Sequence, residues 1–297
     1  MGVQIGLTLP TYLRFATPQG MIATAQKAED YGFHSVWVMD HIVIPEVDES
    51  RFGAVQYEAL SSLAFVAGMT KRIMVGCSVL PIAYRHPLLQ AKMIATIDQL
   101  SGGRVIYGGA AGHLESEFGV LGVDFHRRGA IADEYLQAIR IAWTEERPEF
   151  HGKYVRFSGI RTDPKPLQRP HPTMWVGGDS EAAFRRAFRY GDGWHGRLNA
   201  TTIAADTRLA DVHRVADALG VPRERRRLSL KMDCRIVPEG VAVEERVFFG
   251  TVEKVLSDLR AVEAQGVELV VFSPNVSRLE PSMDAIDTIG RELLPRL

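Results

Sequence analysis

Asp40 and His41 are the residues whose types and position in this sequence most directly suggest chemistry. They are adjacent, and they follow residues 35–39, an apolar run with the composition of a buried strand. A carboxylate beside an imidazole can orient the ring, and an imidazole changes its charge near neutral pH, so this pair could transfer protons. The same dipeptide could equally lie in a loop and cap a helix. The residues alone leave both interpretations open.

Two glycine-rich segments follow other apolar runs and suggest a bound ring or phosphate. Residues 108–113 read GGAAGH, and residues 177–180 read GGDS before a predicted helix. Backbone without side chains lets a planar ring approach closely, and the first turn of a helix offers free N–H groups to an anion. The glycines could alternatively serve only a tight turn. Two such segments on one rim would support each other as a binding surface.

Histidines also raise the question of a metal site, because His41, His86 and His113 could lie in one barrel mouth beside Asp40. The sequence has no His-x-His pair after its first strand-like run and no closely spaced set of metal ligands. We therefore expect no bound metal.

These residues must be positioned by a chain that alternates short β-branched runs with amphipathic segments from end to end. Such alternation predicts a parallel sheet with right-handed crossovers, and eight units fit a closed α/β barrel, (β/α)₈, better than an open doubly wound sheet. No GxGxxG motif follows the first strand, which argues against a dinucleotide-binding fold. The predicted strands span residues 3–9, 35–39, 73–80, 104–108, 173–176, 193–195, 228–237 and 269–272. The clearest predicted helices span residues 19–31, 88–100, 127–143, 180–190, 203–219 and 252–265.

Two segments interrupt this rhythm, at about residues 42–57 and 145–171, and the second contains a hairpin-like stretch over residues 150–157. Long insertions in a compact barrel are usually functional loops rather than separate domains. We predict one barrel domain over residues 1–297, in which these insertions determine the substrate. Binding groups of parallel barrels lie at the carboxyl ends of the strands, where the residues singled out above fall.

Composition argues against several classes of partner and compartment. Lys and Arg total 35 and Asp and Glu total 36, so the chain offers no basic surface of the kind that nucleic acid requires. No apolar run approaches 18 residues, and the first residues lack the pattern of a signal peptide. Cys77 and Cys234 lie far apart in apolar runs, as free core thiols do in a reducing compartment. We expect a cytoplasmic protein that binds neither nucleic acid nor membrane.

Short motifs occur in a recognisable order along nearly the whole chain. They are residues 28–41 (AEDYGFHSVWVMDH), 85–87 (RHP), 91–92 (AK), 98–104 (DQLSGGR), 119–123 (GVLGV), 164–170 (PKPLQRP), 175–178 (WVGG) and 191–195 (GDGWH). In this order and spacing, the motifs resemble the bacterial luciferase-like family of flavin and deazaflavin oxidoreductases. The resemblance agrees with the barrel that the periodicity predicts.

The resemblance implies a metal-free barrel that holds the ring of a flavin-like cofactor in its mouth, with a phosphate tail running toward the glycine-rich loops. A non-prolyl cis peptide often forms a bulge behind the ring in this family, and Ser78-Val79 falls at the matching place. Asp40 is similar to the family residue that contacts the ring or its tail, and His41 to an acid/base residue of some deazaflavin members. The backbone that surrounds the cofactor is matched by Gly108, Gly109, Ala110, Ala111, Gly177 and Gly178.

His113 departs from the family pattern, in which many members carry tryptophan and some deazaflavin dehydrogenases carry glutamate at this place. A histidine there could be a second acid/base group beside His41, or a polar residue of the lid. The sequence leaves both interpretations open.

The function that the resemblance implies is hydride transfer between coenzyme F420, a deazaflavin, and a small organic substrate. The cofactor would supply the chemistry, and the barrel would supply position and electrostatics. The alternatives are an FMN-dependent monooxygenase that uses molecular oxygen, a non-catalytic flavin- or deazaflavin-binding protein, and a metal-dependent hydrolase. The resemblance also leads us to expect a homodimer, which apolar faces over residues 60–69 and 88–97 would allow.

Overall fold

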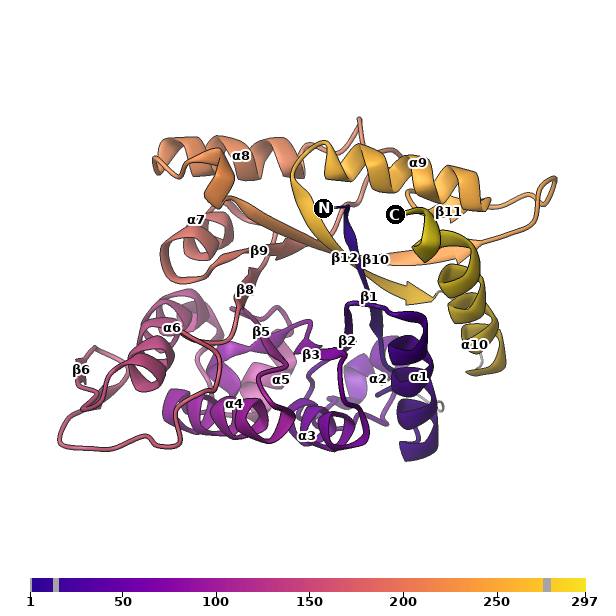
Figure 1. Ribbon diagram of the computed structural model, residues 1–297. Coiled ribbons are helices and arrows are strands. Elements are labelled where there is room, and N and C mark those ends of the chain that lie inside the picture. The colour runs from indigo at the N-terminus through magenta and orange to yellow at the C-terminus, as the bar shows by residue number, and fades with distance from the viewer. Residues whose placement is uncertain (1, 13–15, 275–278) are drawn as a thin grey trace.

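The computed structural model describes residues 2–12, 16–274 and 279–297, and its centre is a closed parallel barrel surrounded by helices (Figure 1). Ten strands form one sheet; two of them, β4 (Leu80–Pro81) and β11 (Phe249–Gly250), are two-residue extensions, and the other eight make the barrel. β10 pairs with both β9 and β12, and β12 pairs with β1, which closes the ring. The predicted (β/α)₈ barrel is therefore confirmed. Its strands are β1 (Gln4–Thr8), β2 (Ser35–Val38), β3 (Met74–Cys77), β5 (Val105–Ala110), β8 (Met174–Gly177), β9 (Gly193–Gly196), β10 (Arg227–Ile236) and β12 (Val267–Pro274).

Each predicted strand is present, with its ends moved by a few residues. β2, β5, β8 and β9 are buried throughout, because helices cover their outer faces and side chains fill the interior. The predicted strand over residues 73–80 is interrupted at Ser78 and Val79, between β3 and β4. Their peptide bond is cis, as the resemblance implied.

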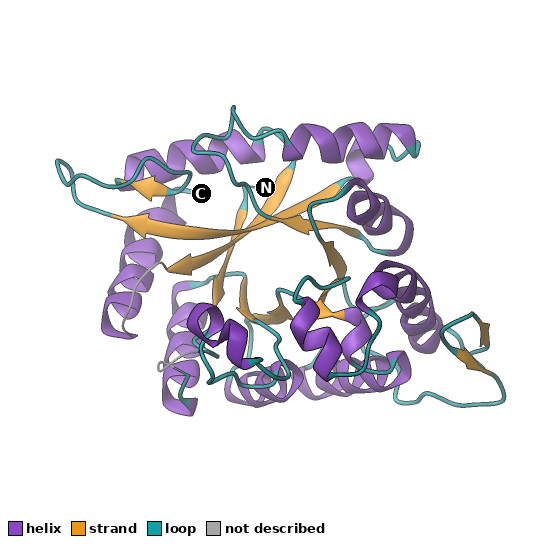
Figure 2. Ribbon diagram, turned by 180° about the vertical axis from the view of Figure 1, so that it is seen from behind, coloured by secondary structure: helices purple, strands orange, loops and turns teal. Residues whose placement is uncertain are grey.

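The helices lie around the barrel, as the view from behind shows (Figure 2). Local sequence determines many of their ends: α1 begins after Thr17, whose side chain accepts a hydrogen bond from the Gly20 N–H, and it ends at Gly32 in the left-handed region. Helix α8 begins later than predicted, because the Asp206 carboxylate accepts from three backbone N–H groups and forms a loop there. The helices are α1 (Pro18–Tyr31), α2 (Glu49–Phe52), α3 (Ala59–Met69), α4 (Pro87–Ser101), α5 (Glu115–Val120), α6 (Arg128–Thr144), α7 (Glu181–Tyr190), α8 (Arg208–Ala218), α9 (Val252–Glu263) and α10 (Leu279–Thr288).

The two insertions lie in different places. Residues 42–57 contain a short 3-10 helix (Glu46–Asp48) and α2, and they reach the barrel mouth. Residues 145–171 contain the predicted hairpin, β6 (Phe150–His151) with β7 (Arg156–Phe157), and pack on the outside of the barrel. Glu134 of α6 accepts from the backbone there, and so does Asp98 of α4. No residue of 145–171 lines the cavity described below, so the expectation that this insertion selects the substrate gains no support.

Two further expectations concern the core and the membrane. Cys77 and Cys234 are both buried free thiols, as predicted. In the part of the chain that the structure describes, no helix combines the length and apolarity that crossing a bilayer requires.

Candidate active site

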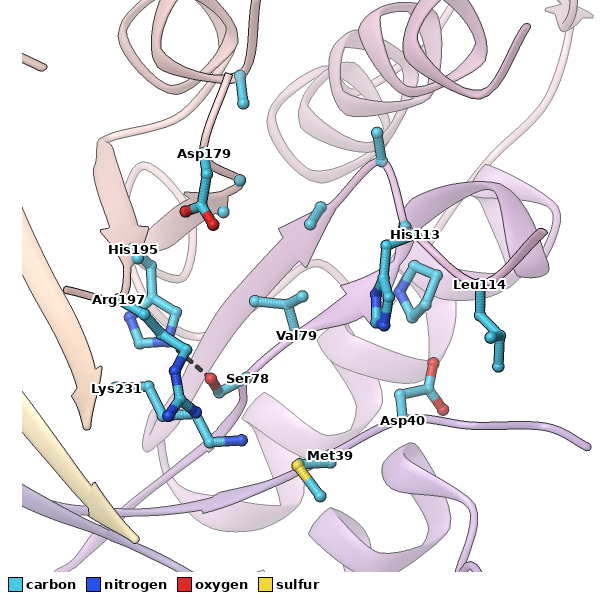
Figure 3. A pocket seen from close by; sticks show the side chains of 18 of the residues that line it. Met39, Asp40, Ser78, Val79, His113, Leu114, Asp179, His195, Arg197 and Lys231 are labelled. Carbon is cyan, nitrogen blue, oxygen red and sulfur yellow. Dashed lines mark hydrogen bonds between the residues drawn. The ribbon is translucent and has the colours of Figure 1, made fainter. Parts of the chain in front are cut away.

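A cavity of about 500 Å³ lies at the carboxyl ends of the barrel strands. Its walls come from the segments after β2, β3, β5, β8 and β9, together with Lys231 from within β10, and Phe52 of α2 reaches it from the first insertion. Figure 3 shows side chains from these segments directed around one space. The position agrees with the rule that parallel barrels carry their sites at this end.

Most of the predicted site residues line this cavity. They are Asp40, His41, Ser78, Val79, Ala110, Ala111, His113, Gly177 and Gly178. Gly108 and Gly109 do not, because they lie in β5 below the cavity. A Cβ atom at Gly108 would lie 1.9 Å from the Cys77 carbonyl oxygen, and one at Gly109 would lie 2.7 Å from the Tyr107 ring. Their small size therefore serves strand packing in this structure.

His41 is held by a buried carboxylate that the sequence did not indicate. The His41 Nδ1 atom lies 2.8 Å from Oε2 of Glu117, which also accepts a hydrogen bond from the Tyr84 hydroxyl. Oε1 of Glu117 accepts from the backbone N–H groups of Ile42 and Val43. Burial opposes ionisation, but the hydrogen bond from His41 and those from the backbone outweigh it, so the pKa of Glu117 is lowered. Glu117 is therefore a fixed carboxylate that orients the imidazole.

Asp40 is occupied by an ion pair within the protein. Both of its carboxylate oxygens accept from Arg85, at 2.7 and 2.8 Å, and Arg85 also donates to Glu58 at the start of α3. Burial raises the pKa of the Asp40 carboxyl, and the bidentate bond from Arg85 opposes that shift. The pair fixes the backbone that carries His41.

His195 connects three strands at the base of the cavity. Its Nε2 atom lies 2.7 Å from the Ser78 hydroxyl, at the cis peptide, and its Nδ1 atom lies 2.9 Å from the Ser229 hydroxyl (Figure 3 draws the first bond). The ring also stacks on Trp37, with the centroids 5.3 Å apart. Burial lowers the pKa of His195 to about 3, and the nearby charge of Lys231 adds to this shift. His195 is therefore a neutral group that holds Ser78 in place.

His113 lies near the opening, where the Phe52 ring of the first insertion packs between it and His41. The ring centroids of Phe52 lie 4.9 Å from His41 and 6.2 Å from His113. Burial lowers the pKa of His113, and the neighbouring charges of His41 and Arg51 lower it further. These surroundings are compatible with both interpretations of His113, as a polar residue at the opening of the cavity and as a second acid/base group.

The cavity fits a planar ring with an anionic tail. A Cβ atom at Gly177 would lie 3.1 Å from the His195 carbonyl oxygen, 3.3 Å from the Val79 side chain and 3.5 Å from the Ala110 Cβ, so glycine keeps the narrow slot beside these residues open. Gly178 follows with a φ of 127°, and α7 begins three residues after it, where backbone N–H groups can face a phosphate. Two arginines also line the cavity: Arg186 from α7 itself and Arg128 from the start of α6.

Several residues of the site were not predicted from the sequence: Tyr84, Arg85, Glu117, His195, Arg197 and Lys231. One signal was available for some of them. Within β10, Ser229, Lys231 and Asp233 alternate with apolar residues in a strand that should be apolar on both faces, so the polar positions had to face the site. Within the described ranges, no cluster of three His, Cys, Asp or Glu side chains could hold a metal ion.

Comparison with known proteins identifies relatives along most of the chain. The model of the luciferase-like monooxygenase family matches residues 4–292. An uncharacterised protein of Mycobacterium tuberculosis is 32% identical over 252 residues, which cover 80% of this chain and 86% of that protein. An F420-dependent glucose-6-phosphate dehydrogenase of Amycolatopsis mediterranei is 35% identical over 181 residues, or 60% of this chain and 53% of the enzyme. An FMNH₂-dependent dimethylsulfone monooxygenase of Pseudomonas putida is 32% identical over 168 residues, or 56% and 46%. The match thus spans about half the length of each of these two enzymes.

Solved structures share the fold at low sequence identity. A monooxygenase from Streptomyces bottropensis superposes with a TM-score of 0.81 at 22% identity, covering 99% of both chains. An F420-dependent secondary alcohol dehydrogenase superposes with a TM-score of 0.80 at 19% identity, again over 99% of both. Together with the family match, these findings show that the chain belongs to the luciferase-like monooxygenase family, whose members include F420-dependent and FMN-dependent enzymes.

Proposed function

We propose that this chain is an F420-dependent oxidoreductase, in which a hydride passes between the deazaflavin and an organic substrate that carries an alcohol or carbonyl group. The observation that carries the proposal is the His41–Glu117 pair on the cavity wall. Oxidising an alcohol removes a hydride from carbon and a proton from oxygen, so the site needs a base as well as a hydride acceptor. Bound F420 would supply the hydride chemistry.

His41 would exchange the substrate proton through its Nε2 atom, because Nδ1 is engaged by Glu117. The Glu117 carboxylate would stabilise the protonated imidazole and keep the ring in one orientation. The proton lost by the substrate oxygen thus passes to His41, and it returns to the oxygen in the reverse reaction. We assign His113 to the same side of the cavity as His41, because the Phe52 ring packs against both. There it would shield the transferred proton from water or share it with His41.

The cofactor would be held by the residues around the slot beside Gly177. Val79 and Ala110 would contact one face of the ring, and Gly177 would admit it closely. The backbone of Gly178 and the start of α7 would receive the phosphate of the tail. Ser78, Ala111 and the backbone of Asp40 complete this set.

The test of the cofactor is a comparison of dissociation constants for F420 and FMN, each measured by fluorescence with the purified protein. We expect F420 to bind more tightly, and tighter binding of FMN would overturn the assignment. The His41→Ala variant serves as a control, because it should keep cofactor binding while losing turnover. Gly177→Ala should weaken binding of either cofactor, because the added methyl group enters the slot.

The second candidate is an FMN-dependent monooxygenase, and the identity to the dimethylsulfone monooxygenase supports it. Such an enzyme would consume oxygen in the presence of reduced FMN and substrate. An F420-dependent enzyme, supplied with reduced F420 and substrate, should consume no oxygen. An oxygen electrode separates the two reactions. A protein that binds either cofactor tightly and turns over no alcohol or carbonyl compound would instead be a non-catalytic carrier.

A further inference from the structure

The inward faces of β9 and β10 carry an unusual row of polar side chains. In β10, Leu228, Leu230 and Met232 are buried, while the residues between them face the barrel interior: Ser229 bonds to His195, and Lys231 lines the cavity. Interior positions of such barrels are usually filled by bulky apolar side chains. A polar row at these positions therefore indicates a role in the site.

Two cations of this row lie at the same level of neighbouring strands. Ser229 pairs with His195 and Leu230 pairs with Gly196 in the register of β10 and β9. One step further along both strands brings Lys231 level with Arg197, and both side chains line the cavity. Like charges opposite each other on adjacent strands repel, so this arrangement is unfavourable unless an anion lies between them.

The protein supplies little negative charge to this pair. Asp233 is the carboxylate nearest to it, and it is shared between Arg197, at 3.1 Å, and Arg246, at 3.0 Å. Among the described residues, the Lys231 amine has no hydrogen-bond or ion-pair partner. Burial lowers the pKa of Lys231 to about 8, and the charge of Arg197 adds to the shift. The pair is thus an incompletely neutralised cationic corner of the cavity.

This corner is separate from the place where a cofactor phosphate would lie. Figure 3 draws Asp179, two residues before α7, at one end of this side of the cavity and Lys231 at the other end, with His195 between them. The other two cations of the cavity belong elsewhere. Arg128 donates to the Gly112 carbonyl, and Arg186 extends from α7 to Asp133. A tail phosphate at the start of α7 would leave the Arg197–Lys231 corner for a different anion.

We propose that Lys231 and Arg197 form a subsite for the phosphate or carboxylate group of an anionic organic substrate. Lys231 provides a point charge, and Arg197 provides a planar donor that can bind two oxygens at once. The substrate's anionic group would lie in this corner, and its reacting oxygen would extend toward His41. This proposal rests on the proposed function, because it names the class of substrate that would bind in the same cavity.

The test titrates inorganic phosphate into protein that is saturated with its tighter-binding cofactor, with calorimetric detection. We expect Lys231→Met to weaken phosphate binding at least about tenfold, equivalent to about 1.4 kcal/mol, and Lys231→Arg to weaken it much less. The exposed Lys71 provides a matched control, so Lys71→Met should bind phosphate as the parent protein does. Acetate, titrated in the same way, shows whether a carboxylate or a phosphate is preferred.

A second measurement needs no variant and so does not depend on the variants folding. Lysine acylation at pH 8, followed by peptide mapping, should show that phosphate slows the modification of Lys231 and leaves that of Lys71 unchanged. Equal phosphate affinity of the parent and Lys231→Met proteins would overturn the subsite. So would phosphate binding that the cofactor abolishes, because the corner would then hold the cofactor's own tail. Tighter binding of FMN than of F420 would refute the proposed cofactor but would leave this test as it stands.

Discussion

At the scale of single residues, the site depends on pairs in which one side chain orients another. Glu117 orients His41, and His195 orients Ser78 at the cis peptide. Each orienting group is buried, so its charge state is determined by the surrounding protein rather than by the solvent. The role of each pair can therefore be tested by changing the charge of the orienting group as well as by changing its shape.

Glu117→Gln should lower kcat for the substrate of this enzyme by at least about tenfold, because the neutral amide no longer stabilises protonated His41. His41→Ala should lower it further, by about 10²- to 10⁴-fold, which is the usual contribution of a general acid or base. Tyr84→Phe is the matched control, because it removes the other side-chain hydrogen bond to Glu117 and keeps the His41 contact. Steady-state kinetics measure all three, and a Glu117→Gln enzyme with the parent kcat would contradict the role of the pair.

His195 should make the protein sensitive to acid. Its pKa is about 3 in the folded protein and about 6.5 in an unfolded chain, so the unfolded state binds more protons between these values. The free energy of unfolding should therefore fall as pH falls below about 6.5, and His195 alone should cost about 2 kcal/mol at pH 5. Urea unfolding at pH 7.5 and pH 5 tests this.

His195→Asn should reduce that acid-induced loss by about 2 kcal/mol. His126 provides the comparison, because its side chain is 82% exposed and His126→Asn should keep the loss of the parent protein. If the parent and His195→Asn proteins lose the same stability between the two pH values, His195 does not stay neutral in the folded state.

At the scale of elements, buried polar side chains join helices to the strands that carry the site. Arg104, just before β5, donates to three carbonyls: those of Ala67 in the last turn of α3, of Thr70 at its C-cap and of Ile73 just before β3. These carbonyls have no partner within a helix, and burial would make them costly to leave unbonded. The DQLSGGR motif thus serves to join α3, α4 and β5, rather than to bind a ligand.

Arg104→Met should therefore lower the free energy of unfolding by about 3 kcal/mol, because several buried carbonyls lose their donor. Arg225→Met, at an exposed position, should change it by less than about 0.5 kcal/mol. Urea unfolding at pH 7.5 measures both variants. A loss below about 1 kcal/mol for Arg104→Met would show that water replaces the guanidinium.

At the scale of the whole molecule, the closed barrel brings distant parts of the chain to one rim. The β1 and β12 strands pair although they lie near opposite ends of the sequence, so the site is formed only when the ring is complete. On the outer surface, α3 and α4 expose three apolar side chains, those of Phe65, Met69 and Leu89. The family resemblance predicts that such helices join two copies of the chain.

We predict a homodimer in solution, which analytical ultracentrifugation would show as twice the mass of one chain. Phe65→Asp should dissociate it, because a two-fold interface carries each substitution twice. Val241→Asp is the control, because Val241 is also an exposed apolar residue but lies in the connection between β10 and β11. A parent protein with the mass of one chain would refute the dimer.

The eight strands, the hairpin and most ends of the six predicted helices could be predicted from the sequence because their signals are local. Apolar periodicity, Thr17 before α1 and Gly32 after it act within a few residues of the structure that they determine. The rim position of Asp40 and His41 followed from the barrel, because the carboxyl end of a strand is known once the strand is. Local patterns thus determined the fold and the end of the barrel at which the cavity lies.

Tertiary structure alone decided which side chains meet there. Glu117 reaches His41 across 76 residues from a six-residue helix whose buried face no periodicity could reveal. Gly108 and Gly109 lie below the cavity, and Arg197 reaches the level of Lys231, because strand register decides depth in a barrel. Register and helix rotation arise from packing between distant segments, so local patterns in the sequence do not reveal them.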